Sequence, residues 1–277
     1  MIGIFDSGAG GLSVFREIYK MLPGESYIYY ADNAHCPYGE KSREYVIGRA
    51  VEITEFLIRH GAGIIVIACN TATTAAIACL REKYSDKSDP EVRKRVSELS
   101  GGRIESISFI GTEPAVKPAA AITKSGVIGV LATAGTLKGQ KYTDTRDLYA
   151  KGIKVVEQVG KGFVEAVERG ETEGPEAERI AEAAVRPLVE AGADAIVLGC
   201  THYPFLKDAI EKTARRIAPD REITVIDPAP AIARRLLAVM DEEGTGNSAG
   251  EPSVQLCASG DDALLKEMAS RIISGTL

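Results

Sequence analysis

Residues 61 to 77 read GAGIIVIACNTATTAAI, and this stretch decides the fold. The run Ile64 to Ile67 contains only β-branched residues and predicts a strand without a polar face. Such a strand is typical of a parallel sheet that helices cover on both faces. Cys69, Asn70 and Thr71 come next, followed by small residues that suit a helix. The stretch therefore predicts a strand, a polar turn with a thiol, and a helix.

The same pattern occurs a second time, where residues 192 to 203 read GADAIVLGCTHY. Cys200 lies 131 positions after Cys69, and Gly192 lies 131 positions after Gly61. Ligands of open α/β sheets bind outside the carboxyl ends of the strands. Two thiols at equivalent points of two similar units are therefore candidates for a functional site.

Strands and helices alternate along the rest of the chain, which predicts an α/β fold with mostly parallel sheets. The other predicted strands cover residues 2–5, 27–30, 104–110, 127–131, 155–159, 223–226 and 254–257. The segment from Gly3 to Ser7 is similar to that from Gly129 to Thr133, which supports a duplicated plan. A Gly, Ser, Asn and Pro-rich stretch at 243–252 predicts a loop.

Composition excludes several classes of partner. The chain has 277 residues, 45% of them hydrophobic, and a net charge of −6 without a basic run, which argues against nucleic acid. No segment approaches ~18 consecutive apolar residues, so we expect no membrane contact. The start MIGIFDSG is unlike a signal peptide, and five cysteines fit a reducing compartment. These features predict a cytoplasmic protein.

Residues 85 to 103 differ from their surroundings because they are polar, charged and nearly free of aromatic residues. They predict a short, solvated helix from Pro90 to Leu99, ended by two glycines. The stretch is read as a surface elaboration, with a regulatory insertion as the alternative.

The two thiols suggest a chemistry. A cysteine beside a helix N-terminus is favoured as thiolate by the helix dipole and the free N–H groups. Inversion of a carbon needs a proton removed from one face and another delivered to the opposite face, and two thiols can serve as base and acid. The alternative is that Cys69 and Cys200 are small buried hydrophobic residues at strand ends.

Several polar residues follow predicted strands and could hold a carboxylate through hydroxyls, amides and helix N-terminal N–H groups. They are Asp6, Ser7, Tyr38, Gly39, Asn70, Thr71, Thr133, Thr136 and Thr201. Helix capping is the alternative role for any one of them. His202 is placed to polarise or protonate beside Cys200. No second Cys/His pair has zinc spacing, so we expect no metal, and GAGG at 8–11 lacks the features of a nucleotide loop.

With these residues identified, the chain resembles the glutamate racemases of the cofactor-independent aspartate/glutamate racemase superfamily. The matching motifs are IGIFDSGAGGLSV, ADNAHCPYGEKS, ACNTAT, GVLATAGT, LGCTHYP and the final SGDD. They span nearly the whole length in the order of the family.

The resemblance implies racemisation of L- and D-glutamate without a cofactor, with Cys69 and Cys200 as the proton donor and acceptor pair. It implies that the first thiol handles the proton of the D-isomer and the second that of the L-isomer. Asp6 and His202 are implied as auxiliary groups beside the thiols, and an acidic residue of the family maps to Glu168. The implied substrate contacts are Asp6, Ser7, Tyr38, Gly39, Asn70, Thr71, Thr133, Thr136, Thr201 and His202.

The resemblance also implies two lobes with the active site in the cleft between them. A discontinuous first lobe would comprise residues 1–111 and 223–277, and a second lobe residues 112–222. A homodimer and a role in supplying D-glutamate for peptidoglycan, and so for cell-wall biogenesis and cell shape, are implied as well. The chain departs from the family at Gly160-Lys161, where Cys-Pro is frequent, and at Thr112, where a hydrophobic residue is common.

Three alternatives remain. Aspartate racemase belongs to the same superfamily, but its members tend to carry Glu where this chain has His202. A two-lobed carboxylate-binding module would need no thiols in register. A cysteine amidohydrolase would need one thiol and a positioned base rather than a matched pair.

Overall fold

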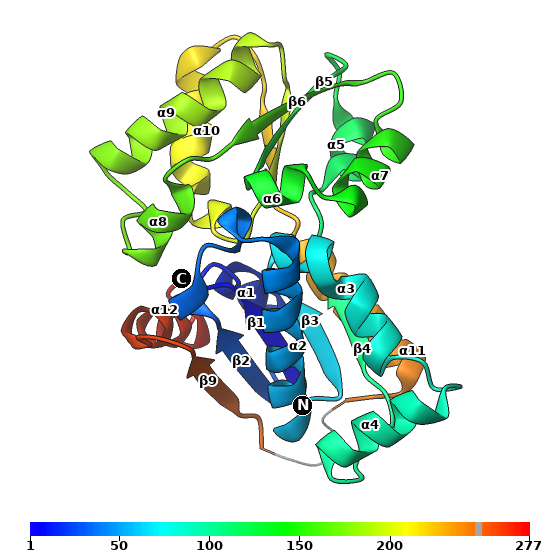
Figure 1. Cartoon of the computed structure of the whole chain (residues 1–277). Coiled ribbons are helices and arrows are strands. Elements are labelled where there is room, and N and C mark those ends of the chain that lie inside the picture. Colours follow the sequence, from blue (N-terminus) through cyan, green and yellow to red (C-terminus); the bar gives the residue numbers. More distant parts are fainter. Residues whose placement is uncertain (247–250) are drawn as a thin grey trace. The chain divides into compact units, whose positions relative to one another are not determined.

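The computed structural model describes residues 1–246 and 251–277. The chain folds into two compact units, which we call unit 1 and unit 2. Unit 1 contains Met1–Thr112 and Ala229–Leu277, and unit 2 contains Glu113–Pro228. Each unit is a parallel sheet covered by helices (Figure 1), so the predicted α/β class with two similar lobes is confirmed.

Unit 1 contains a five-stranded parallel sheet in the order β4-β3-β1-β2-β9. Its strands are β1 (Ile2–Asp6), β2 (Tyr27–Ala31), β3 (Ile64–Ile67), β4 (Ser108–Gly111) and β9 (Val254–Ala258). On one face α2 (Arg43–Arg59), α3 (Asn70–Tyr84) and α4 (Pro90–Ser100) pack together, and on the other α1 (Leu12–Met21), α11 (Ala229–Glu243) and α12 (Ala263–Ile273) do so (Figure 1). Both faces of the central strands are therefore buried, as the apolar run at 64–67 predicted.

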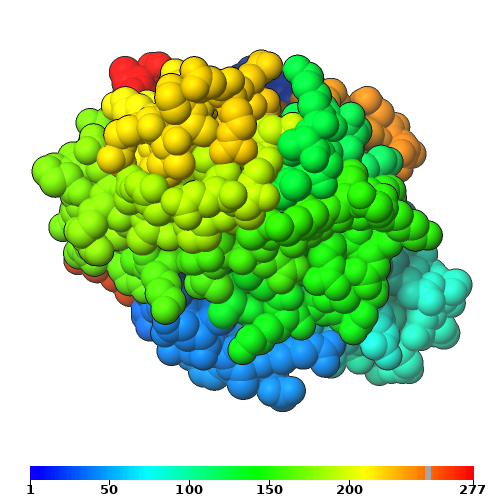
Figure 2. Space-filling view, turned by 90° about the horizontal axis from the view of Figure 1, so that it is seen from above, coloured from blue at the N-terminus to red at the C-terminus, as the bar shows by residue number. Residues whose placement is uncertain are grey.

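Unit 2 contains a four-stranded parallel sheet in the order β6-β5-β7-β8. Its strands are β5 (Val127–Ala132), β6 (Lys154–Val159), β7 (Ala195–Gly199) and β8 (Thr224–Ile226). Helices α5 (Val116–Ile122) and α7 (Gln140–Tyr149) pack together, as do α9 (Pro175–Glu190) and α10 (Lys207–Ile217), while α6 (Ala134–Leu137) and α8 (Phe163–Glu168) are short. In the space-filling view of Figure 2, the green to yellow residues of unit 2 form a continuous surface.

The two sheets repeat one plan, as the sequence predicted. Read from one edge, β4-β3-β1-β2 in unit 1 corresponds to β8-β7-β5-β6 in unit 2, with β9 added only to unit 1. Gly61 and Gly192 both adopt a left-handed conformation, with φ of 97° and 99°, just before β3 and β7. Since L side chains rarely adopt such a φ, glycine ends the preceding helix in both copies.

The prediction that the chain returns to the first lobe at residue 223 is wrong. β8 pairs in parallel with β7, with Ala195 opposite Thr224, so this strand completes the sheet of unit 2. It occupies the edge position that β4 holds in unit 1, and the chain re-enters unit 1 only after Pro228. The other boundary moves by one residue, because Thr112 belongs to unit 1.

The predicted strand at 104–110 is shorter than expected, because only Ser108–Gly111 joins the sheet. The N–H of Ile107 donates to the carbonyl of Tyr84 at 2.8 Å, so this residue is tied to the end of α3 and not to β3. Within the loop predicted at 243–252, residues 247–250 lie outside the described residues.

The polar stretch at 85–103 forms the expected helix, α4, but this helix is more than a solvated elaboration. Asp89 caps it by accepting from the N–H of Glu91, and Gly101 ends it with φ 65°. Val92 and Val96 are buried in the core of unit 1. None of the helices in the described residues has the length and apolar character needed to cross a membrane.

Candidate active site

Cys69 lies between the end of β3 and the start of α3. Its sulfur accepts the N–H of Ala72 at 3.4 Å and therefore caps the helix. The thiol is 5% exposed and lies 3.7 Å from the hydroxyl of Ser7. Ser7 follows β1, which neighbours β3 in the sheet. The parallel pairing of these strands thus brings the predicted residues Ser7 and Cys69 together.

Asp6 ends β1 and is fully buried. Its carboxylate accepts the N–H groups of Gly8 and Gly11, each at 3.1 Å. Helix α1 begins at Leu12, after the N-cap residue Gly11, whose N–H is one of the two that Asp6 accepts. Asp6 thus organises the glycine turn that leads to the helix, at the same end of the sheet as Cys69.

Asn70 and Thr71 open α3 directly after the thiol, and both are buried. Among the described residues, neither the Oδ1 nor the Nδ2 atom of Asn70 has a hydrogen-bond partner. Buried polar side chains are nearly always paired in folded proteins, because an unpaired one loses its hydration without compensation. Asn70 is therefore a buried amide whose hydrogen-bonding capacity is unused within the described residues.

Tyr38 and Gly39 lie in the turn between β2 and α2, which contains two short 3₁₀ segments, Asn33–His35 and Tyr38–Glu40. The Tyr38 side chain is 1% exposed, and its hydroxyl donates to Asp32 at 2.5 Å. Its ring belongs to the same core cluster as Cys69. The structure therefore places Tyr38 in the thiol-bearing unit, but commits its hydroxyl to a residue that the sequence did not single out.

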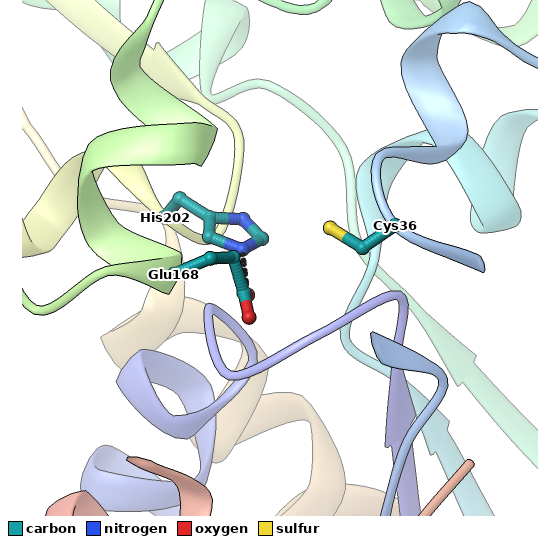
Figure 3. Close-up of side chains that lie close together, drawn as sticks. All are labelled: Cys36, Glu168 and His202. Atoms are coloured by element: carbon teal, nitrogen blue, oxygen red, sulfur yellow. Dashed lines mark hydrogen bonds and ion pairs between the residues drawn. The ribbon is translucent and has the colours of Figure 1, made fainter. Parts of the chain in front are cut away.

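Cys200 follows β7 in unit 2, where it takes the place that Cys69 has after β3. His202 lies beside it, with Nδ1 3.7 Å from the Cys200 sulfur. The other ring nitrogen, Nε2, is 2.6 Å from the carboxylate of Glu168, the last residue of α8. Figure 3 shows this carboxylate directed at the ring; Cys36, drawn with them, belongs to unit 1. Glu168, His202 and Cys200 thus form a contiguous row.

The threonines of unit 2 lie at the same ends of its strands. Thr133 follows β5 and caps α6 by accepting the N–H of Thr136 at 3.3 Å, so the capping interpretation holds for this residue. The two hydroxyls are 3.0 Å apart. Thr201, between Cys200 and His202, is buried.

Two contacts beside the thiols were not predicted from the sequence. The Thr112 hydroxyl donates to the carbonyl of Ala68 at 3.0 Å and so fixes the residue before Cys69. In unit 2 the Tyr203 hydroxyl donates to the carbonyl of Gly160. A Cβ atom at position 160 would lie 2.7 Å from the Tyr203 hydroxyl oxygen. A side chain at position 160 would therefore require the Tyr203 ring to shift. Burial raises the pKa of the Tyr203 hydroxyl.

A comparison with protein families gives one match that spans most of the chain. The Asp/Glu/Hydantoin racemase family matches residues 2–236. The chain belongs to this family. The resemblance that the motifs indicated is thereby confirmed at the level of the racemase family.

Individual relatives point to one branch of this racemase family. The chain is 43% identical to a glutamate racemase from Ectopseudomonas mendocina, over 94% of this chain and 89% of the relative. Its fold is similar to a glutamate racemase isoform from Bacillus anthracis, with 31% identity, a TM-score of 0.81, and coverage of 99% and 94%. A glutamate racemase from Escherichia coli, solved with L-glutamate and an activator, is 30% identical, with a TM-score of 0.78 and coverage of 98% and 94%.

Proposed function

We propose that this racemase interconverts L- and D-glutamate by a two-base mechanism in which Cys69 and Cys200 carry the protons. The observation that supports it best is the pair of thiols at equivalent positions of two repeated sheets, each after the same strand of the plan. Similarity to glutamate racemases over 94% of the chain supports the choice of glutamate. No cofactor is part of the proposal.

The two thiols take opposite roles in the two directions. With D-glutamate, the Cys69 thiolate removes the α-proton, and the Cys200 thiol delivers its proton to the opposite face. The product is L-glutamate, with Cys69 now a thiol and Cys200 a thiolate. L-glutamate then reacts by the reverse sequence, because each group is base in one direction and acid in the other. The proposal requires both sulfurs to reach one α-carbon.

Glu168 and His202 are proposed to serve Cys200. When the Nε2–H group of His202 donates to Glu168, Nδ1 faces the sulfur 3.7 Å away and can exchange a proton with it. Asp6 is proposed as the auxiliary group on the Cys69 side, because it shapes the turn that carries Ser7. The two thiols thus have different partners.

The remaining residues are proposed to bind glutamate. Asn70 offers an amide without a partner in the described part of the chain, and the hydroxyls and N–H groups at the strand ends suit carboxylates. The proposed contacts are Asp6, Ser7, Tyr38, Gly39, Asn70, Thr71, Thr133, Thr136, Thr201 and His202. For Tyr38 the contact is proposed through the ring or backbone, since its hydroxyl donates to Asp32.

The biological role is proposed from the family resemblance alone. We infer that the enzyme acts in the cytoplasm as a homodimer and supplies D-glutamate for peptidoglycan. Sedimentation of the purified protein tests the dimer, and depletion of the gene in its host, with D-glutamate added back, tests the pathway.

The activity is tested by incubating the protein with L-glutamate in deuterated water. We expect the optical activity to vanish while deuterium enters the α-position. Retained optical activity without exchange would leave only a carboxylate-binding module. L-aspartate serves as the parallel substrate, and racemisation of aspartate alone would assign the chain to the other branch of the superfamily.

The mechanism is tested by replacing each thiol separately. Cys69→Ala and Cys200→Ala should each abolish racemisation, because one face of the α-carbon then lacks its proton carrier. Cys79→Ala is the matched control, since it removes a half-buried thiol of α3 that has no proposed role. Racemisation at the wild-type rate by either of the first two variants would refute the two-base assignment.

A further inference from the structure

Asp32 is a buried carboxylate that the proposed mechanism does not use. It follows β2 directly and is 0% exposed. Its N–H donates to the carbonyl of Asp6 at 2.9 Å, so its backbone is fixed to the end of β1. The next residues form the turn that contains Tyr38 and Gly39. Asp32 is thus the point at which this turn leaves the sheet.

Three side chains from different parts of unit 1 converge on the Asp32 carboxylate. Arg49 of α2 binds both oxygens, with Nη2–Oδ1 and Nε–Oδ2 distances of 2.8 Å. The Tyr38 hydroxyl donates to Oδ2 at 2.5 Å, and Ser259 supplies another hydrogen bond. Burial opposes ionisation, but these hydrogen bonds outweigh it and hold the pKa of Asp32 below its usual value. The Asp32 side chain is therefore a carboxylate that these hydrogen bonds hold in a fixed position.

The segment Ser259–Asp261, which follows β9, contacts the start of the same turn. The Ser259 hydroxyl accepts the N–H of Ala34 at 3.0 Å, and the N–H of Gly260 donates to Asn33 Oδ1 at 2.8 Å. The Asn33 amide in turn donates to the carbonyl of Asp261. The C-terminal segment thus holds residues more than two hundred positions earlier in the chain, because β9 pairs with β2.

We propose that Asp32, Arg49 and the Ser259–Asp261 segment are positioning residues that hold the Tyr38–Gly39 turn in its substrate-binding conformation. The inference rests on the proposed function, in which this turn contacts glutamate. Arg49 and Ser259 fix Asp32 from two sides, and Asp32 fixes the Tyr38 hydroxyl. The Tyr38 ring is thereby seated in the core cluster that contains Cys69.

This role predicts a particular kinetic pattern. The turn serves both enantiomers, whereas each thiol removes a proton from only one. Loosening the turn therefore raises KM for L- and D-glutamate alike and lowers kcat less. A change at either thiol instead removes turnover. The ratio of the KM effect to the kcat effect distinguishes positioning of the turn from damage to the proton carriers.

The test compares Asp32→Asn with Glu52→Gln. Glu52 is the exposed second partner of the same Arg49, and its loss removes a surface ion pair without touching the turn. For Asp32→Asn we expect KM to rise about tenfold or more for both enantiomers, the factor that a hydrogen bond to a charged group typically carries. Glu52→Gln should match the wild type. Hydrogen exchange of peptides covering 33–41 should accelerate by a similar factor in Asp32→Asn and stay unchanged in Glu52→Gln.

Ser259→Ala covers the case in which Asp32→Asn fails to fold, because it removes hydrogen bonds to Asp32 and Ala34 without leaving a charge unpaired. It should raise both KM values and the exchange of residues 33–41 by about threefold or more, because one of the lost hydrogen bonds goes to the charged Asp32 carboxylate. Wild-type exchange and KM in these variants would overturn the positioning role. A wild-type protein that exchanges no α-proton would instead overturn the proposed function, and the exchange of residues 33–41 would still test whether the turn is held.

Discussion

At the scale of a single residue, Asn70 combines burial with an unused hydrogen-bonding capacity. It is 2% exposed, and within the described part of the chain both of its side-chain polar atoms lack a partner. Burial of an unpaired amide costs about 1–3 kcal/mol. The sequence marked Asn70 as a candidate carboxylate contact, whereas its lack of a partner among the described residues depends on the packing around α3.

Asn70→Ala should therefore separate stability from activity. We expect the free energy of unfolding to stay equal or rise slightly, because an uncompensated polar group is removed. We expect kcat/KM for glutamate to fall about 10- to 100-fold, the effect of losing hydrogen bonds to a charged ligand. Urea unfolding and racemisation kinetics check the two parts. A strongly destabilised variant would show that the amide has a structural partner.

Among the elements, α4 is the one whose role the sequence described least well. Its composition predicted a solvated surface helix, yet Val92 and Val96 face the core of unit 1. Two valines four positions apart are a weak signal, because most of the helix is polar. Their burial depends on α2 and α3, against which α4 packs.

Val96→Ala should consequently destabilise unit 1 by about 2 kcal/mol, from lost apolar burial and the cavity that remains. The matched control is Lys94→Ala, which alters an exposed position on the same helix and should change the free energy of unfolding by less than about 0.5 kcal/mol. Urea unfolding measures both. Equal changes in the free energy of unfolding for the two variants would show that α4 is only a solvated surface helix.

The turn between β2 and α2 should make stability depend on pH. The folded pKa of Asp32 lies below that of the unfolded chain, about 3.9. The contribution of ionised Asp32 to the free energy of unfolding is therefore fully present above the unfolded pKa, and it is lost as the pH falls through the folded pKa. Asp32→Asn should lower the free energy of unfolding by about 3 kcal/mol at pH 6. This difference from the wild type should become smaller below about pH 4. Urea unfolding of both proteins across this pH range tests the prediction. A difference in unfolding free energy that does not change with pH would contradict it.

At the scale of the whole molecule, the two units differ in how the chain builds them. Unit 2 is one continuous segment, Glu113–Pro228, whereas unit 1 needs Met1–Thr112 together with Ala229–Leu277. The second segment of unit 1 supplies β9, which pairs with β2, and α11, which packs on α1. Folding of unit 1 therefore depends on residues that are synthesised last.

Fragments of the chain test this dependence. A fragment of residues 113–228 should unfold cooperatively in urea, because it retains its whole sheet and has the size of an ordinary domain. A fragment of residues 1–112 should lack a cooperative transition, because the β2 edge and the apolar face of α1 are left uncovered. Addition of the fragment 229–277 should restore it. Cooperative folding of 1–112 alone would contradict the prediction.

Much of the fold could be predicted because its signals are local. The apolar run before Cys69 and the matching run before Cys200 define buried parallel strands, and their fixed offset defines the repeat. The position of β8 could not be predicted, since a short apolar strand carries no mark of the sheet that it joins. Similarly, Glu168 could be placed only by resemblance, because nothing in its local sequence indicates that it meets His202.

The sequence by itself determined the α/β class, the duplicated plan, the racemase family and the location of both thiols at strand ends. The class, the plan and the thiol positions follow from the order and spacing of neighbouring residues, and the family follows from the resemblance of the motifs. The tertiary structure alone decided that Asn70 has no partner among the described residues, that Glu168 reaches His202, and that Arg49 and Ser259 meet on Asp32. Each of these depends on residues brought together by strand pairing and helix packing over long stretches of chain, which no local pattern encodes.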